Sequence, residues 1–175
     1  LQLREKDLEQ DAFLEEAFAV KALCRRFGVP FLIDDDVSLA LRCGADGIHV
    51  GQSDMEAGEV RARIGPDKIL GVSVQTVSQA VLAREAGADY LGVGAVFSTS
   101  TKLDADTVSF DTLRKICAAV DIPVVAIGGI NTENLLELSG SGIAGVAVVS
   151  AIFAAPSPQA AAHRLHVLAQ IATQG

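Results

Sequence analysis

Several features that would each indicate a particular class of protein are missing from this sequence of 175 residues. Its longest apolar run, residues 143–155, is too short and too interrupted by Gly and Ser to cross a bilayer. It has no basic stripe with interleaved aromatic residues, and its formal net charge of -8 would repel nucleic acid. No basic leader with a cleavage site opens it. The sequence therefore predicts that no nucleic acid and no membrane is bound, and that the partners are small molecules.

Cysteine and histidine do not show the spacings of common catalytic and metal sites. Cys24, Cys43 and Cys117 are odd in number, far apart and within stretches of helical period, so they indicate neither a disulfide framework nor a metal knuckle. No Ser–His–Asp set, thiolate–His pair or zinc spacing is evident, which argues against acyl transfer and metallohydrolysis. A reducing, cytoplasmic setting fits these cysteines best.

What the sequence does contain is a regular alternation of short β-branched runs with longer stretches of helical period. We expect strands near residues 1–4, 30–34, 46–50, 68–74, 89–94, 122–127 and 144–149. We expect helices near residues 9–27, 36–43, 56–63, 76–86, 108–119, 132–139 and 158–172. Capping patterns support three of the helix starts: Ser53 with Glu56, Thr76 with Gln79, and Ser157 before Pro158.

The expected strands at 122–127 and 144–149 are apolar on both faces, which favours a parallel sheet covered by helices. Repeating βα units of this kind form either an open doubly wound sheet or a closed eight-stranded barrel. The sequence opens within the first of seven expected strands, which suggests that one earlier βα unit is absent from it. A chain of this length with 50% hydrophobic residues is expected to form one domain over residues 1–175.

The carboxyl ends of the expected strands, where ligands bind in both architectures, are polar. Arg4 and Lys6, two apart on the first strand, would project to one face, where their charges could neutralise a bound anion. Alternatively they form a solvated strand end that pairs with Glu5 and Asp7.

Two more strand ends carry acids, and a later one carries paired glycines. Asp35 and Asp54 end neighbouring strands, as expected of oxygen ligands for a cation that keeps several waters, although Asp54 could instead favour a helix dipole. Gly128 and Gly129 could bring backbone N–H groups close to a phosphate, or could only make a tight turn. His49 lies in an apolar pattern and is interpreted as a core histidine.

In this order and spacing the sequence resembles the thiamine phosphate synthase family, from the first residue nearly to the last. The motifs are QLREK, GADGIHVGQSD, GADYLGVGAVFSTSTK, VVAIGGIN and GVAVVSAI. The resemblance implies an α/β fold, a (β/α)8 TIM barrel whose first βα unit is missing from this chain. It also implies a transferase that joins a hydroxymethylpyrimidine diphosphate to a hydroxyethylthiazole phosphate, releases pyrophosphate and uses Mg²⁺ as cofactor.

The resemblance assigns roles to individual residues. Arg4, Lys6 and Lys102 are the expected catalytic residues, and Asp35 and Asp54 are the expected Mg²⁺ ligands. The expected substrate-binding residues are Gln2, Leu3, Arg4, Glu5, Lys6, Asp34, Ser73, Thr99, Ser100, Thr101, Lys102, Gly129, Val149 and Ser150.

Asp34 departs from the family, which typically carries Asn there. An Asn amide would donate to the diphosphate, whereas an ionised Asp would repel it. We therefore expect Asp34 to turn to the cation as a further ligand, and Asp36 to cap the helix that follows.

Two other functions stay open at this point. A thiazole tautomerase resembles the synthase in its thiazole-phosphate half but does not need QLREK or the paired Asp ligands. A non-catalytic paralogue would bind a thiamine precursor and act through a protein partner. The sequence leaves the oligomeric state undecided.

Overall fold

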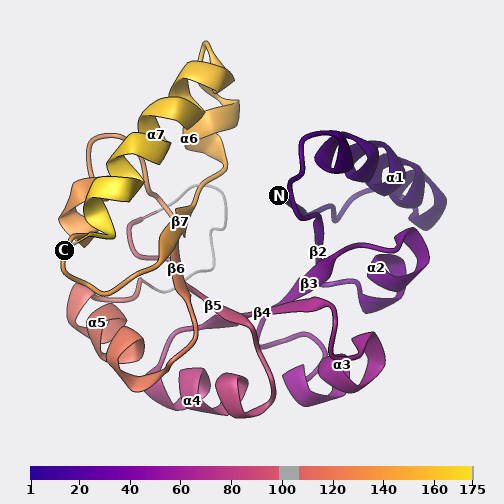
Figure 1. Ribbon diagram of the computed structural model, residues 1–175, viewed down its shortest axis with the longest axis horizontal. Helices are drawn as coiled ribbons and strands as arrows, with labels where there is room; N and C mark the ends of the chain where they lie inside the picture. Colours follow the sequence, from indigo (N-terminus) through magenta and orange to yellow (C-terminus); the bar gives the residue numbers. More distant parts are fainter. Residues whose placement is uncertain (99–106, 175) are drawn as a thin grey trace. The chain divides into compact units, whose positions relative to one another are not determined.

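The computed structural model describes residues 1–98 and 107–174 (Figure 1). The strands are β1 (Gln2–Leu3), β2 (Leu32–Asp34), β3 (Gly47–Val50), β4 (Ile69–Val74), β5 (Tyr90–Val93), β6 (Val124–Ile127) and β7 (Gly145–Ala147). The helices are α1 (Gln10–Arg26), α2 (Val37–Cys43), α3 (Ala57–Ile64), α4 (Val77–Glu85), α5 (Phe110–Ala119), η1 (Leu135–Leu138), α6 (Ser150–Phe153) and α7 (Pro158–Ala172). Each expected strand region contains one strand, so the βα alternation is confirmed. No helix within the described residues is long and apolar enough to span a bilayer.

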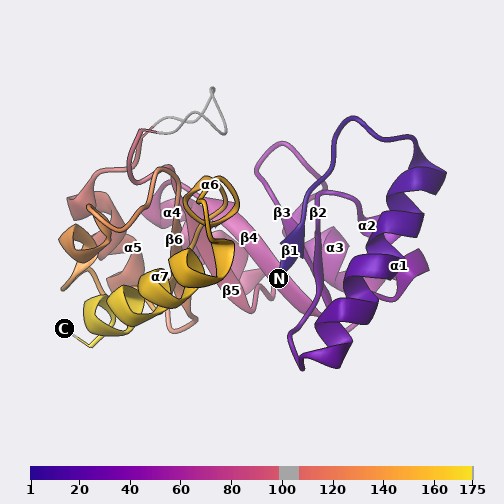
Figure 2. The ribbon, with the colours of Figure 1, turned by 90° about the horizontal axis from the view of Figure 1, so that it is seen from above.

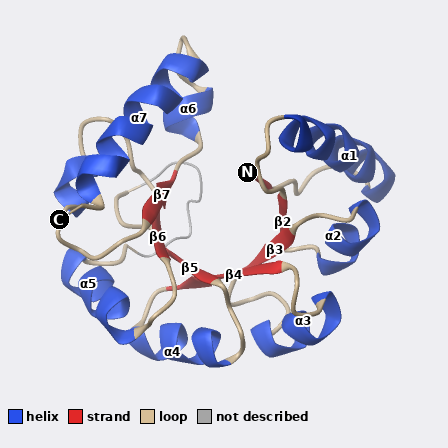
Figure 3. Cartoon of the chain, viewed as in Figure 1, coloured by secondary structure: helices blue, strands red, loops and turns tan. Residues whose placement is uncertain are grey.

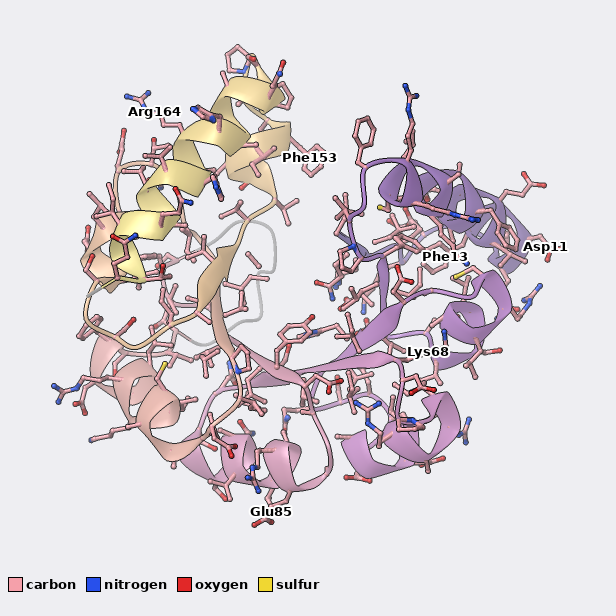
Figure 4. All side chains as sticks on the ribbon, viewed as in Figure 1. Asp11, Phe13, Lys68, Glu85, Phe153 and Arg164 are labelled. Carbon is pink, nitrogen blue, oxygen red and sulfur yellow. The ribbon has the colours of Figure 1, made fainter. Side chains whose placement is uncertain are left out.

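The chain forms two compact units, of which the first comprises residues 1–73 and 85–89. Strands β1 to β4 pair in chain order, and each pairing is parallel, which confirms the prediction of a parallel sheet. Helices α1, α2 and α3 lie along one side of β2 and β3 (Figures 1 and 2). Phe31, Ile33 and Ile48 are fully buried, and Phe13 of α1, labelled in Figure 4, is 6% exposed. The core of this unit thus lies between the strands and their helices.

The second unit comprises residues 74–84 and 90–175, and its strands β5, β6 and β7 also pair in parallel and in chain order. Helices α4, α5 and α7 lie along one side of these strands (Figure 3). Leu91, Leu113 and Leu135 are fully buried beneath them. A parallel strand order of this kind directs the carboxyl ends of β5 to β7 to one edge.

Of the three capping patterns expected at Ser53, Thr76 and Ser157, two are confirmed. Thr76 and Gln79 form a reciprocal capping box, because the Gln79 N–H donates to Thr76 Oγ1 at 3.2 Å and the Thr76 N–H donates to Gln79 Oε1 at 3.2 Å. Ser157 caps α7 through its Oγ, and Pro158 stands at the first helical position.

The expected capping box of Ser53 with Glu56 is wrong. Helix α3 begins at Ala57, so Glu56 is itself the N-cap, and its carboxylate accepts the Glu59 N–H at 3.1 Å. A carboxylate at the cap satisfies a free N–H and also favours the positive end of the helix dipole.

The helix expected over residues 132–139 is reduced to the short 3₁₀ helix η1. Asn131 and Asn134 bind backbone N–H groups of their own turn, and such side-chain bonds compete with helical ones. Ser139 then adopts an extended conformation that ends the segment. Helix α6 was not expected, because four residues are too short for a periodic pattern.

Candidate functional site

Arg4 and Lys6 converge on the carboxyl end of β2. β1 ends at Leu3, so both residues lie beyond the strand, and strand geometry is not what places them on one face. Arg4 Nε lies 3.1 Å from Asp34 Oδ2, and Lys6 Nζ lies 2.8 Å from Asp35 Oδ2. Their side chains are still 47% and 53% exposed. Two cations are thus held in place while remaining accessible to an anion from solvent.

Glu5 shapes the turn that carries these cations. Its Oε1 accepts the N–H groups of Lys6 and Asp7, each at 2.7 Å. The hydrogen bonds from Asp7 and Lys6 lower the pKa of Glu5. Glu5 therefore binds the backbone of its own turn, while Arg4 and Lys6 pair with Asp34 and Asp35.

The three successive acids after β2 have three different environments. Asp34 Oδ1 accepts the Gln2 side-chain amide at 2.6 Å, and Asp34 Oδ2 faces Arg4. Asp36 Oδ1 accepts the Leu39 N–H at 2.8 Å and caps α2, as expected. Asp35 lies between them in the left-handed region, with φ 65. Because that conformation is uncommon for a residue other than Gly, it marks Asp35 as a constrained position.

Burial and charge separate the pKa values of the first two acids. Burial of the Asp34 side chain, which is 11% exposed, is the main cause that raises its pKa to about 6, and the Asp35 charge adds to it. Burial also acts on Asp35, but hydrogen bonds from Lys6 and Asp54 outweigh it and lower the pKa of Asp35. Asp35 is therefore the more acidic member of the pair.

Asp54 reaches the same place from the loop after β3. Its carboxyl group lies close enough to Asp35 to help lower the pKa of that acid, and its Oδ2 accepts the Gly51 N–H at 2.7 Å. A Cβ at position 51 would lie 2.9 Å from this oxygen, so a larger residue there would displace the Asp54 carboxylate. Asp54 precedes α3 by several residues, and that helix has its own cap in Glu56. The helix-dipole alternative for Asp54 is thereby weakened.

The donor set of Asp35 and Asp54 fits Mg²⁺. Two carboxylates that lie close together repel each other, and a divalent cation relieves that repulsion. In the part of the chain that the structure describes, no group of three or more His, Cys, Asp or Glu side chains is arranged around a metal position. Mg²⁺ commonly uses only one or two carboxylates, together with waters and substrate phosphates.

His49 and Ser73 extend this site onto the neighbouring strands. His49 of β3 is the register partner of Asp34, and its backbone carbonyl accepts the Asp35 N–H at 2.9 Å. His49 Nε2 lies 2.8 Å from Ser73 Oγ on β4, and Gln52 donates to the Ser73 carbonyl at 2.8 Å. His49 is 8% exposed, which confirms it as a buried, hydrogen-bonded histidine.

The link from His49 to Ser73, and the part played by Gln52, were not predicted. His49 and Ser73 project to the same face of adjacent strands, since His49 pairs with Gly71 and Ser73 is two residues farther along β4. The strand register would have indicated this contact, but the register does not follow from the sequence alone.

In the second unit, the expected phosphate-binding residues lie at the carboxyl ends of β6 and β7. Ile127 pairs with Ala147, so Gly129 and Val149 each stand two residues past a paired position. Gly129 has φ 66, and a Cβ there would lie 2.5 Å from the Ser98 carbonyl oxygen. Val149 is 53% exposed, and Ser150 begins α6. The structure thus brings these three residues to one edge of the second unit.

The remaining expected site residues, Thr99, Ser100, Thr101 and Lys102, lie outside the residues that the structure describes. Leu3, expected to contact substrate, is partly exposed within β1.

Comparison with known proteins gives the same family as the motifs. A family model described as thiamine monophosphate synthase matches residues 1–152. The thiamine-phosphate synthase of Ruminiclostridium cellulolyticum is 52% identical over 165 residues, which are 94% of this chain and 79% of that protein. The thiamine-phosphate synthase of Clostridioides difficile is 50% identical over 155 residues, which are 89% of this chain and 74% of that one.

A solved structure agrees with this relationship. The thiamine phosphate pyrophosphorylase from Pyrococcus furiosus superposes with a TM-score of 0.90 at 37% sequence identity, covering 98% of this chain and 82% of that one. The seven parallel strands and their helices therefore form an α/β fold like that of the Pyrococcus furiosus protein. Since the family model spans most of the chain and the relatives match at about half identity, the chain belongs to the thiamine monophosphate synthase family, whose members are enzymes of thiamine biosynthesis.

Proposed function

We propose that this chain is a transferase that couples 4-amino-2-methyl-5-hydroxymethylpyrimidine diphosphate to 4-methyl-5-(2-hydroxyethyl)thiazole phosphate. The products are thiamine phosphate and pyrophosphate. The observation that carries the proposal is the convergence of Arg4 and Lys6 on Asp34 and Asp35 beside Asp54. A site that combines two accessible cations with a carboxylate pair suits a diphosphate better than a neutral substrate.

The reaction is proposed to be a dissociative displacement. The bond between the pyrimidine methylene carbon and the diphosphate oxygen breaks first, and the diphosphate leaves with the electron pair. Arg4 and Lys6 stabilise the charge that develops on it, and Lys102 is proposed to join them. The thiazole ring nitrogen then donates its lone pair to the methylene carbon and forms the new C–N bond.

Asp35 and Asp54 would hold Mg²⁺ in this reaction. When bound, Mg²⁺ would supply positive charge to the departing diphosphate without any proton transfer. The Asp34 carboxylate binds Gln2 and Arg4 in this structure, and its expected role as a further Mg²⁺ ligand stays a prediction.

The thiazole half is proposed to bind through the second unit. Gly129, Val149 and Ser150 would bind the thiazole phosphate, and residues 99–101 would cover the thiazole ring. Catalysis in this scheme consists mainly of positioning two substrates and stabilising charge, because no residue needs to form a covalent intermediate.

We also propose that the strands belong to a (β/α)8 barrel forming a single domain over residues 1–175, and that the protein works in the cytoplasm. Three cysteines without disulfide bonds support the reducing setting.

The proposed function is tested by incubating the protein with both substrates and Mg²⁺ and measuring thiamine phosphate by mass spectrometry. We expect product and pyrophosphate in equal amounts, and loss of turnover on chelation of Mg²⁺. Isomerisation of a thiazole carboxylate phosphate without consumption of the diphosphate would instead identify a tautomerase. Binding of either substrate with no product would identify a non-catalytic paralogue.

A further inference from the structure

We propose that Asn134 is the positioning residue of the phosphate-binding turn, residues 128–130. Its side-chain amide holds this turn so that two successive backbone N–H groups are directed toward the phosphate of the thiazole substrate. This inference rests on the proposed function, because it takes the Gly129 turn as the place where that phosphate binds.

Two hydrogen bonds fix the carbonyl groups of the turn. The Gly128 carbonyl accepts the Phe97 N–H at 3.1 Å, and the Gly129 carbonyl accepts Asn134 Nδ2 at 2.9 Å. In a trans peptide the C=O and the N–H of the same plane point in opposite directions. The two bonds therefore direct the N–H groups of Gly129 and Ile130 away from Phe97 and Asn134 respectively.

The backbone conformation of the turn favours an anion in that direction. Gly128 and Gly129 have φ 99 and φ 66, which only glycine adopts without strain. Successive N–H groups that converge in turns with left-handed residues form small concave sites that bind anions.

The turn has little freedom to adopt another shape. A Cβ on Gly128 would lie 2.6 Å from Ala95 Cα, and one on Gly129 would lie 2.5 Å from the Ser98 carbonyl oxygen. The segment from Ala95 to Ser98 thus limits movement on one side, and the Asn134 amide supplies the remaining anchor.

Asn134 is itself held by a reciprocal pair of contacts with Asn131. Asn134 Oδ1 accepts the Asn131 N–H at 2.8 Å, and Asn131 Oδ1 accepts the N–H groups of Glu133 at 2.8 Å and Asn134 at 3.3 Å. Position 134 therefore needs both a donor and an acceptor on one short side chain, which an Asn amide provides and an Asp carboxylate does not. Asn131, by contrast, takes part in this pair through its oxygen.

This difference supplies a matched pair of variants. Asn134→Asp keeps the acceptor, loses the bond to Gly129 and adds one negative charge. Asn131→Asp adds the same charge three residues away and keeps its acceptor. Asn134→Ala removes both functions without adding charge. Each full-length variant is first compared with the wild type by thermal unfolding.

The Kd of the thiazole phosphate is measured for each variant and compared with the Kd of the unphosphorylated thiazole alcohol. The KM values of the thiazole phosphate and of the pyrimidine diphosphate are measured as well. From the net strength of one hydrogen bond we expect a roughly tenfold weaker Kd and a higher KM for the thiazole phosphate in both Asn134 variants. Asn131→Asp should change them much less, and the thiazole alcohol and the pyrimidine diphosphate should be unaffected. Equal losses for the phosphate and the alcohol, equal changes in both KM values, or equal effects of the two Asp variants would overturn the inference.

A second measurement uses the wild type alone, so it stands even if both Asn134 variants fail to fold. Inorganic phosphate is titrated into ¹⁵N-labelled protein, and the amide resonances of Gly129 and Ile130 are followed. We expect both to shift downfield in a saturable manner, and the absence of such shifts would refute the inference. Thiamine phosphate formation is measured separately, so wild-type protein that binds phosphate at these amides but makes no product would contradict the proposed function and leave the inference standing.

Discussion

Replacing Asp34 by Asn tests how the first of the three acids is used. The Asp34 carboxylate is nearly buried. It accepts a hydrogen bond from the Gln2 side-chain amide and forms an ion pair with Arg4. Asn has almost the same shape, can still accept from Arg4, and can exchange its donor and acceptor with the Gln2 amide. The substitution therefore removes the charge while leaving the contacts nearly intact.

The pKa of Asp34 sets the size and sign of the expected effect. Its pKa is raised from 3.8 to about 6, chiefly by burial and then by the charge of Asp35. Since the folded protein binds this proton more tightly than the unfolded chain, the associated stability is fully present below about pH 4. It is lost as the pH rises through about 6. A shift of two units corresponds to about 3 kcal/mol as an upper limit, and solvent screening of the Asp35 charge, whose side chain is 28% exposed, reduces this to about 1–2 kcal/mol.

We therefore expect Asp34→Asn to raise the free energy of unfolding by about 1–2 kcal/mol at pH 7.5 and hardly at all at pH 4. Urea unfolding followed by circular dichroism, at several pH values and in the presence of a chelator, measures this difference. Asp121→Asn is a control of opposite sign, because the ion pair with Arg84 lowers the pKa of Asp121 to about 2, and its stabilising effect is present at neutral pH. A variant of Asp34 that is less stable at pH 7.5, or equally stabilised at every pH, would refute this reasoning.

Three further substitutions test the remaining parts of the first unit. Asp54→Ala should lower kcat/KM by about a hundredfold or more and abolish the stimulation of activity by Mg²⁺. The control Asp36→Ala removes a cap worth about 1 kcal/mol and should keep that stimulation, so equal loss of stimulation in both variants would exclude Asp54 as a ligand. His49→Phe should raise the KM for the diphosphate about as much as Ser73→Ala, and the double variant should have the same KM as either single variant. Additive increases in KM would show that His49 does not act through Ser73. Arg61→Lys should cost about 2 kcal/mol or more in urea unfolding, because Lys cannot reproduce the several hydrogen bonds of the guanidinium; a loss below about 0.5 kcal/mol would contradict this.

The fold was predictable where the signal is a pattern over many residues and was missed where it is local. Apolar runs such as residues 122–127 gave the strands, because a parallel strand buried on both faces leaves a continuous hydrophobic run. The 3₁₀ helix at Leu135–Leu138 was predicted as a longer helix, because the prediction rested on the spacing of its apolar residues and did not consider Asn131 and Asn134. The turn that competes with this helix is held by individual hydrogen bonds of Asn131 and Asn134, and the periodicity of apolar residues does not predict such bonds.

The site shows the same division between local and long-range information. Asp36 could be predicted as a cap because its partner, the Leu39 N–H, is three residues away. The pairing of Arg4 with Asp34 joins residues 30 positions apart and depends on the register in which Leu3 pairs with Ile33. The motif resemblance placed both residues at the site, but only the register explains why they meet.

The backbone at Asp35 explains how three adjacent acids can serve three purposes. In a regular strand, Asp34 and Asp36 would point to one face and Asp35 to the other. The left-handed conformation of Asp35, held by its N–H donating to the His49 carbonyl, breaks that alternation where β2 ends. Asp34, the residue after the Leu3–Ile33 pair, faces Arg4, whereas Asp35 pairs with Lys6. Asp36 then caps α2. Asp and Asn are among the few residue types other than Gly that tolerate this conformation, so the backbone narrows the choice of residue at position 35 and the charge selects the acid.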